Sequence, residues 1–186
     1  MKLSRIIYII ITKIKNLKYK FIDEKLLLLN CGKVGHGSHI LRQSNIIGIE
    51  NIYLGNNVII GLGSTIYTTN ANVIIKDKVI VGPHLTLITG DHQFDILGKE
   101  MIDITDNQKD INLDQDIVIE EDVWIGANVT ILKGVTIGSG CVIAAGSLVT
   151  KNTKPYGIYA GVPAKLIKMR FTEEEIKLHL DILNKK

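Results

Sequence analysis

Residues 113–151 read LDQDIVIEEDVWIGANVTILKGVTIGSGCVIAAGSLVTK, and apolar side chains recur in this stretch every six positions. An α-helix repeats near 3.6 residues and a β-strand near 2, so neither explains a sustained period of six. Small residues such as Gly126, Gly138 and Ala144 stand beside the aliphatic ones, which is typical of short strands joined by tight corners. The pattern predicts an all-β fold, a parallel β-helix. One inward ladder is Leu113, Ile119, Ile125, Ile131, Ile137, Ile143 and Val149, and the other is Ile117, Val123, Val129, Val135, Cys141 and Ser147.

The same period continues upstream, where it starts near residue 34 and is interrupted twice. Three residues inserted at 70–72 shift the register, and residues 93–112 break the pattern with a polar, acidic segment. Insertions into a solenoid leave it as loops, and such loops often build binding sites. We expect residues 31–154 to form the β-helix and residues 93–112 an extruded loop; the alternative is a surface insertion without a role. The upstream ladder positions are Val34, Ile40, Ile46, Leu54, Ile60, Ile66, Ile75, Val81 and Leu87.

Length and composition limit the function classes. A chain of 186 residues suits one domain, and a net charge of +3 without interleaved arginine and aromatic residues argues against a nucleic-acid partner. Of the two cysteines, Cys141 takes an inward position and is expected to be a buried hydrophobe rather than half of a disulfide with Cys31, as in a reducing cytoplasm. The apolar run 6–11 is shorter than the roughly 20 residues of a membrane span and precedes no small-residue cleavage site. We expect a cytoplasmic protein.

The N-terminal segment, residues 1–30, alternates apolar and basic residues and carries no acid before Asp23. The favoured interpretation is a helical cap over the open end of the β-helix, because repeat folds need such caps. The alternative is a basic amphipathic helix that contacts the inner face of an anionic membrane through residues 1–22. The basic residues are Lys2, Arg5, Lys13, Lys15, Lys18 and Lys20.

The C-terminal segment, residues 155–186, follows the last hexad. Residues 156–170 are expected to run back along the prism as an extended arm. Thr172 and Glu175 then have the spacing of a capping box, which predicts a short helix over residues 173–183.

Several motifs resemble those of one known family. Residues 125–148 divide into IGANVT, ILKGVT, IGSGCV and IAAGSL, with ITGDH upstream at 88–92 and AGVPAK downstream at 160–165. Over about residues 34–170 the chain resembles the hexapeptide-repeat acyltransferases, in particular sugar O-acetyltransferases of the maltose, galactoside, capsule and O-antigen type. The resemblance implies a left-handed β-helix with three hexapeptides per turn, and a homotrimer with active sites between subunits. It also implies acetyl-CoA as co-substrate, no required metal, and a saccharide acceptor in cell-surface polysaccharide biosynthesis.

His92 is the candidate general base. Acetyl transfer from a thioester to a hydroxyl needs a base, and imidazole suits that task. His92 stands at the end of the last regular rung and at the mouth of the loop, and the resemblance implies that it is catalytic. Its orienting partner stays open between Asp91, Asp95 and other groups. Gln93 and Phe94 replace the proline and the residue after it in the galactoside pattern, so the acceptor need not be a simple galactoside or maltose. The other histidines, His36, His39, His84 and His179, are expected to be structural or at the surface.

A candidate donor groove follows from the repeat. Ala127 and Ala145 are 18 residues apart, one full turn, and are expected to stack; the resemblance implies that the pantetheine arm of acetyl-CoA lies beside them. The alternative is that alanines merely fill a narrow corner. The resemblance places Thr150, Lys151, Lys165 and Lys168 near the phosphates of coenzyme A.

The single tryptophan, Trp124, points outward and is expected to pack on a ligand or on another subunit. Together with Val118, Leu148 and Tyr159, it predicts apolar outer faces that become buried between subunits.

Three other functions stay open from the sequence. One is N-acetylation of an amino-sugar nucleotide, in which the base matters less. Another is a zinc hydratase, which needs three histidines at a fixed spacing that His36, His39, His84 and His92 do not reproduce. The third is a non-catalytic scaffold, disfavoured by the presence of both the base and the donor motifs.

Overall fold

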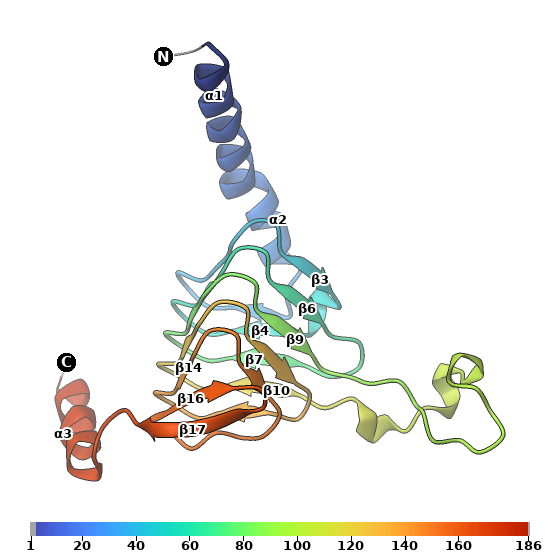
Figure 1. Cartoon of the computed structure of the whole chain (residues 1–186). Coiled ribbons are helices and arrows are strands. Elements are labelled where there is room, and N and C mark those ends of the chain that lie inside the picture. The colour runs from blue at the N-terminus through green and yellow to red at the C-terminus, as the bar shows by residue number, and fades with distance from the viewer. Residues whose placement is uncertain (1–2, 186) are drawn as a thin grey trace.

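The computed structural model describes residues 3–185 and shows the predicted left-handed parallel β-helix, a triangular prism with one sheet on each face (Figure 1). Each turn of the chain contributes one short strand to each sheet. Sheet A consists of β1 (Lys33–Val34), β4 (Ile52–Leu54), β7 (Val73–Ile75), β10 (Ile117–Ile119) and β13 (Thr136–Ile137). Sheet B consists of β2 (His39–Ile40), β5 (Ile59–Ile60), β8 (Ile80–Val81), β11 (Trp124–Ile125), β14 (Val142–Ile143), β16 (Gly157–Gly161) and β17 (Ala164–Met169). Sheet C consists of β3 (Asn45–Ile47), β6 (Thr65–Tyr67), β9 (Thr86–Ile88), β12 (Thr130–Leu132) and β15 (Leu148–Val149).

The aliphatic ladders line the interior of the prism, as predicted. Ile119 stacks on Ile137 and Ile125 on Ile143, each pair 18 residues apart, and all four side chains are buried. The second ladder from Ile117 to Ser147 is buried as well.

Two residues depart from the predicted pattern. Leu113 is only half-buried, because it belongs to a 3-10 turn that precedes the first rung after the loop. Tyr159 points inward instead of outward: it stacks on Ile143 as the last rung of the core, and its hydroxyl accepts a hydrogen bond from the Lys154 backbone N–H at 2.8 Å.

The corners of the prism have a regular backbone that the ladders alone did not reveal. One residue per hexad takes a positive φ, at positions 122, 128, 134, 140 and 146. Asp122 and Asn128 fill the first two of these positions, and both residue types tolerate the left-handed region better than most. The other three are glycines, which adopt it without steric cost.

The loop between β9 and β10 is the largest interruption of the coil. Ile75 pairs with Ile119, 44 residues later, whereas Ile119 pairs with Ile137, 18 residues later. The extra residues leave the prism as a long projection (Figure 1). It contains only 3-10 turns: η3 (Met101–Asp103), η4 (Asp106–Gln108) and η5 (Ile111–Leu113). A further 3-10 turn, η2 (Ile49–Asn51), lies between β3 and β4.

The N-terminal segment is helical but covers the prism only with its end. Helix α1 (Leu3–Lys18) continues through a π-helical turn η1 (Tyr19–Asp23) into α2 (Glu24–Leu29). Leu27 and Leu28 of α2 pack against the core, whereas α1 projects away from the prism (Figure 1). Of the segment expected to cap the prism, α2 is therefore the part that packs against the core. Residues 1 and 2, and with them Lys2, lie outside the described part of the chain.

The C-terminal segment differs from the predicted arm. β16 adds a parallel rung to sheet B, and β17 turns back antiparallel beside it, so the chain ends the sheet with a hairpin instead of running along the prism. Helix α3 (Glu173–Asn184) follows with the predicted capping box, in which the Thr172 hydroxyl accepts from the Glu175 backbone N–H at 3.2 Å. Among the helices of residues 3–185, none combines the length and apolar character that crossing a bilayer requires.

Candidate active site

His92 lies at the corner that follows sheet C, where the loop leaves the prism. The rung before it is firmly held, because the Thr89 backbone N–H and hydroxyl donate to the Tyr67 carbonyl at 3.1 and 3.3 Å. Gly90 forms an isolated antiparallel bridge with Asp114 on the returning strand of the loop. The His92 side chain is exposed, and within residues 3–185 neither of its ring nitrogens has a hydrogen-bond partner. The imidazole is therefore presented to solvent from a rigid corner.

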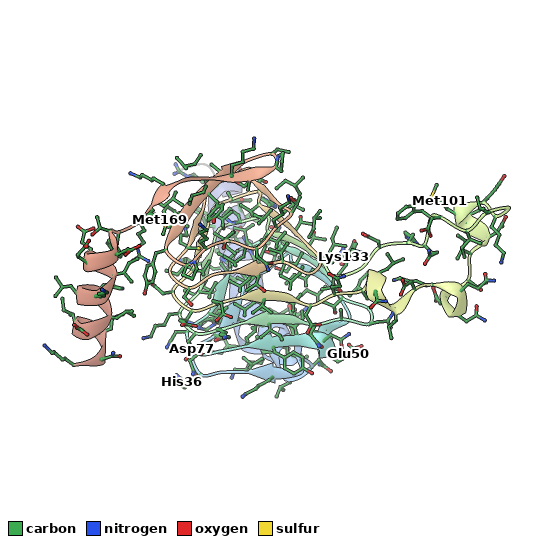
Figure 2. The ribbon with its side chains drawn as sticks, turned by 90° about the horizontal axis from the view of Figure 1, so that it is seen from below. His36, Glu50, Asp77, Met101, Lys133 and Met169 are labelled. Carbon is green, nitrogen blue, oxygen red and sulfur yellow. The ribbon has the colours of Figure 1, made fainter. Side chains whose placement is uncertain are left out.

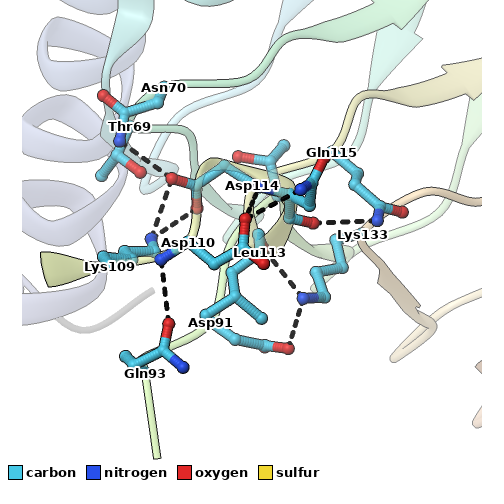
Figure 3. Close-up of polar contacts among 12 residues, drawn as sticks. Thr69, Asn70, Asp91, Gln93, Lys109, Asp110, Leu113, Asp114, Gln115 and Lys133 are labelled. Atoms are coloured by element: carbon cyan, nitrogen blue, oxygen red, sulfur yellow. Dashed lines mark hydrogen bonds and ion pairs between the residues drawn. The ribbon is translucent and has the colours of Figure 1, made fainter. Parts of the chain in front are cut away.

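The base of the loop is closed by a buried carboxylate that the sequence did not single out. The Asp114 side chain is only 3% exposed and accepts from Lys109 Nζ at 2.7 and 2.8 Å and from Asn70 Nδ2 at 2.8 Å (Figure 3). Burial by itself would raise the pKa of Asp114, but the hydrogen bonds from Lys109 and Asn70 outweigh it and lower the pKa. These contacts hold the returning end of the loop against the corner that carries Asn70. We call Asp114, Lys109 and Asn70 the loop clamp.

The two acids proposed to orient His92 are engaged elsewhere. Asp91 forms an ion pair with Lys133 Nζ at 2.8 Å, and the same ammonium donates to the Leu113 carbonyl at 2.9 Å (Figure 3). Asp95 accepts a hydrogen bond from the Gln93 side chain, so it too is paired within the loop. Figure 2 shows Lys133 at the root of the loop, with Met101 far out along it. Neither of these contacts involves the imidazole.

The predicted stacking of Ala127 on Ala145 is confirmed. Both lie at the corner between sheets B and C, where the Gly146 backbone N–H donates to the Ala127 carbonyl at 2.8 Å. The register of sheet B places Leu62 and Pro83 in the same column on earlier coils. In this column the side chains are therefore larger on the two earlier coils and only a methyl group on the two later coils. We call Ala127 and Ala145 the alanine column.

The other proposed donor residues lie in three places. Lys165 pairs with Ala160, whose rung lies directly over Ala144, so it lies one position to the side of the alanine column. Trp124 and Lys168 lie in one outward column of sheet B, connected through Val142 and Ile158. Trp124 is 57% exposed, as expected for a residue awaiting a partner. Thr150 and Lys151 are exposed at the far end of sheet C, two coils from His92 and away from the alanine column.

One face of the prism separates His92 from the alanine column. Ala127 comes before strand β12, whereas His92 comes after β9, which pairs with β12 in the same direction. These strands have three residues each, and a three-residue strand spans about 10 Å before its corners are added. A single chain therefore presents the base and the alanine column on different edges of sheet C.

A large cavity lies on another side of the molecule. It has a volume of about 1010 Å³ and is bounded by sheet A residues such as Tyr53 and Ile74 and by α3, on the side opposite the loop in Figure 2. His179, expected to be solvated, packs there against Phe171 at 5.2 Å between ring centroids, and its Nε2 is buried without a hydrogen-bond partner. Across residues 3–185, no group of three or more metal-ligating side chains comes together.

Comparison with known proteins connects this architecture with acyl transfer. The family model for bacterial transferase hexapeptides, with six repeats, matches residues 116–151. A galactoside acetyltransferase solved in complex with coenzyme A is 30% identical, with a TM-score of 0.66, over 81% of this chain and 71% of that one. A hexapeptide-repeat-containing acetyltransferase from Vibrio cholerae O1 biovar eltor, solved with acetyl-coenzyme A, is 28% identical, with a TM-score of 0.67, over 80% and 76%.

A short stretch of the chain is more closely related to another acetyltransferase. It is 61% identical over 36 residues to the chloramphenicol acetyltransferase of Klebsiella aerogenes. That stretch covers 19% of this chain and 17% of the length of that relative.

The loop clamp makes a testable contribution to stability. Asp114→Asn should leave the Lys109 ammonium without its counter-charge and loosen the loop by about 1–3 kcal/mol, so trypsin should cut after Lys99 several-fold faster at pH 8. Asp103→Asn, at an exposed loop position, is the control and should cut at the wild-type rate.

The same variant should show a defined pH dependence. Because the folded-state pKa of Asp114 is lowered, its contribution to stability is present above the ordinary aspartate pKa of about 3.9 and is lost as the pH falls through the folded value. The difference in thermal midpoint between wild type and Asp114→Asn should therefore shrink below about pH 4. A pH-independent difference would show that the carboxylate charge is not what closes the loop.

Proposed function

Because this chain belongs to the hexapeptide-repeat acetyltransferase family, we propose that it transfers an acetyl group from acetyl-CoA to a hydroxyl of a saccharide. The observation that carries the proposal is the pairing of two features along sheet C. One edge presents an exposed histidine beside a clamped loop, and the other presents a column of minimal side chains. A base and a narrow groove for an extended thioester are what such a reaction needs.

In the proposed mechanism His92 removes the proton of the acceptor hydroxyl as its oxygen attacks the thioester carbonyl carbon. A carbon–oxygen bond forms, the carbon–sulfur bond breaks, and the thiolate of coenzyme A takes the proton back from His92. Proton and charge therefore balance over one cycle, and His92 returns to its starting state. The rigid rung below it, held by Thr89, fixes where the proton is taken.

The donor would lie along the alanine column. A pantetheine arm is slender and rich in amides, and methyl side chains leave the corner backbone accessible to it. A Cβ added at Gly146 would meet no atom within 4 Å, so the outside of this corner is open. Lys165 beside the column and Lys168 farther along β17 would meet the phosphates of coenzyme A, because both are exposed cations at the end of sheet B. Trp124 would cover the groove from sheet B.

A complete site would need two subunits. His92 and the alanine column lie on different edges of one prism, so the base of one chain can meet the donor groove of the next where two prisms pack side by side. Trp124 and Ile80 are adjacent on sheet B, 57% and 55% exposed, which is apolar surface that such packing would bury. We therefore propose a homotrimer with three shared sites. Thr150 and Lys151 follow sheet C as His92 does, so we assign them to the histidine-bearing side of that interface.

The acceptor would enter between the loop and His92. Phe94 is 64% exposed two residues beyond the base and offers a ring on which a sugar face can stack. Gln93, by contrast, is tied to the loop, because its Oε1 accepts from the Asp110 backbone N–H at 2.9 Å. We assign the acceptor to cell-surface polysaccharide biosynthesis, with the reaction in the cytoplasm where acetyl-CoA is made.

The base is tested by His92→Ala. Turnover should fall about 10²- to 10⁴-fold, the usual contribution of general base catalysis, while the thermal midpoint stays unchanged because the side chain is exposed. Release of the coenzyme A thiol in the presence of saccharide acceptors is the measurement. His36→Ala, another exposed corner histidine, is the matched control. Wild-type turnover in His92→Ala would refute the assignment.

The donor groove is tested by Ala145→Trp. The indole would occupy the space proposed for the pantetheine arm, so the affinity for coenzyme A in calorimetry should fall by more than about tenfold without loss of the fold. Leu62→Trp is the control, because Leu62 occupies the same corner column on an early coil. Equal affinities in the two variants would mean that the alanines only fill the corner.

The shared site is tested by mixing the two damaged proteins. Trimers that contain both His92→Ala and Ala145→Trp chains would have some interfaces with an intact base and an intact groove. Activity should therefore partly return after subunit exchange, to no more than a fraction of wild type. Exchange should be followed independently by native mass spectrometry. If mixed trimers form and no activity returns, each site belongs to a single chain.

A further inference from the structure

Helix α1 is an unusually exposed element with an apolar stripe along one side. Ile6, Ile10, Ile14 and Leu17 recur every three or four residues, so they lie along one side of the helix. They are 37%, 51%, 59% and 55% exposed, because α1 projects from the prism and nothing in residues 3–185 covers this side (Figure 1). A soluble protein seldom leaves such a stripe uncovered.

The charges on α1 are all of one sign. Lys13 and Lys18 fall at the two edges of the apolar stripe at 100° per residue, and Arg5 falls on the opposite side. No acidic residue occurs before Asp23, whose carboxylate lies 3.7 Å from the Lys18 ammonium. Lysines that flank an apolar stripe can bury their stems and keep their ammonium groups at a polar interface.

The base of α1 is fixed to the prism. The Tyr19 hydroxyl donates to the Ile40 carbonyl at 2.6 Å. The buried Glu24 carboxylate lies within hydrogen-bond distance of His39 Nδ1, at 3.0 Å. Burial, with the nearby carboxylates of Glu24 and Asp23, raises the pKa of Tyr19 to about 12, so its hydroxyl stays a donor. The Arg42 guanidinium also donates a hydrogen bond to the side-chain oxygen of Asn16 in α1. The helix is thus held at one end and free along the rest.

We propose that α1 docks flat on a membrane surface rich in anionic lipid. Its apolar stripe would enter the boundary between headgroups and acyl chains, and its lysines would meet the lipid phosphates. At 1.5 Å per residue the 16-residue helix is about 24 Å long and carries four basic residues, which suits a helix in the plane of the surface and not a span. The enzyme would then act at the face of a membrane, as a lipid-linked glycan acceptor requires.

Charge decides between a membrane and a second copy of the helix. Ile7, Ile10, Ile14 and Leu17 also fit the a and d positions of a heptad, which would allow α1 helices to associate. In that register Lys13 falls at position g and Lys18 at position e, where neighbouring parallel helices would bring like charges together. With no acid on α1 to relieve this repulsion, an anionic surface is the better partner.

The test is sedimentation of the full-length protein with phosphatidylcholine vesicles, with and without about 30 mol% phosphatidylglycerol. Wild type should bind the anionic vesicles and release from them as salt is raised. Since each lysine near such a surface contributes about fivefold to binding, Lys13→Glu with Lys18→Glu, at the two edges of the stripe, should weaken it by more than tenfold. Lys177→Glu with Lys185→Glu makes the same charge change on α3 and at its C-cap, and should bind like wild type.

A second variant tests the apolar stripe and self-association together. Ile10→Asn with Ile14→Asn should abolish vesicle binding while the oligomeric mass by light scattering stays that of wild type. Leu97→Asn with Ile102→Asn, at loop side chains 99% and 87% exposed, is the control for lost apolar surface. Wild-type binding by the Ile10/Ile14 variant, equal binding to neutral and anionic vesicles, or a fall in its oligomeric mass would each overturn the proposal. No acetyl-CoA is present in these assays, so their outcome is independent of the proposed activity.

Discussion

Every coil of this protein is placed by the backbone hydrogen bonds that connect it to the next coil. The Ile80 N–H donates to the Val123 carbonyl at 2.9 Å, and the Trp124 N–H donates to the Cys141 carbonyl at 3.0 Å, in the same direction around the prism. Parallel pairing fixes the separation of neighbouring coils near 4.8 Å. Each rung must therefore stack on its equivalent in the next turn, and the aliphatic ladders are the consequence. Residues that do not fit a turn have to leave the prism, as residues 93–112 do.

This constraint explains why chemistry can only be built at the corners and on the outer faces. The interior is filled by ladder side chains such as Ile125 and Ile131, with no room for a ligand. The corners differ from coil to coil, because only some positions are restricted there, such as the residue with positive φ and Gly126, where an added Cβ would lie 2.5 Å from the Ala145 nitrogen. The column that runs from Leu62 through Pro83 to Ala127 and Ala145 is an example, since it changes from bulky to minimal side chains without disturbing any rung.

Features that depend on the six-residue repeat could be predicted from the sequence. Contacts between the segments that interrupt the repeat could not. The six-residue period predicted the buried rungs and the stacking of Ala127 on Ala145, because coil-to-coil pairing converts spacing directly into contact. The six-residue period also placed Leu113 on a rung, and this prediction is wrong. A leucine at the right spacing fits the period even where the chain has not yet returned to the prism. The loop clamp could not be predicted, because Asn70 and Asp114 are 44 residues apart and meet only once the loop has closed. The sign of the loop clamp in the sequence is Asp114, an aspartate at the point where the regular period resumes.

Helix α1 and the proposed donor groove lie at opposite ends of the prism. Helix α1 is held at the first coils through Tyr19 and Glu24, whereas the alanine column and Lys165 lie on the last ones. A membrane that binds α1 would lie nearest to the first coils, because α1 extends away from the later ones (Figure 1). The loop leaves from a middle coil, between the two ends, and Phe94 and His92 stand at its root. A soluble donor could then reach the groove from the open side, while an acceptor anchored in the lipid could approach His92 along the loop.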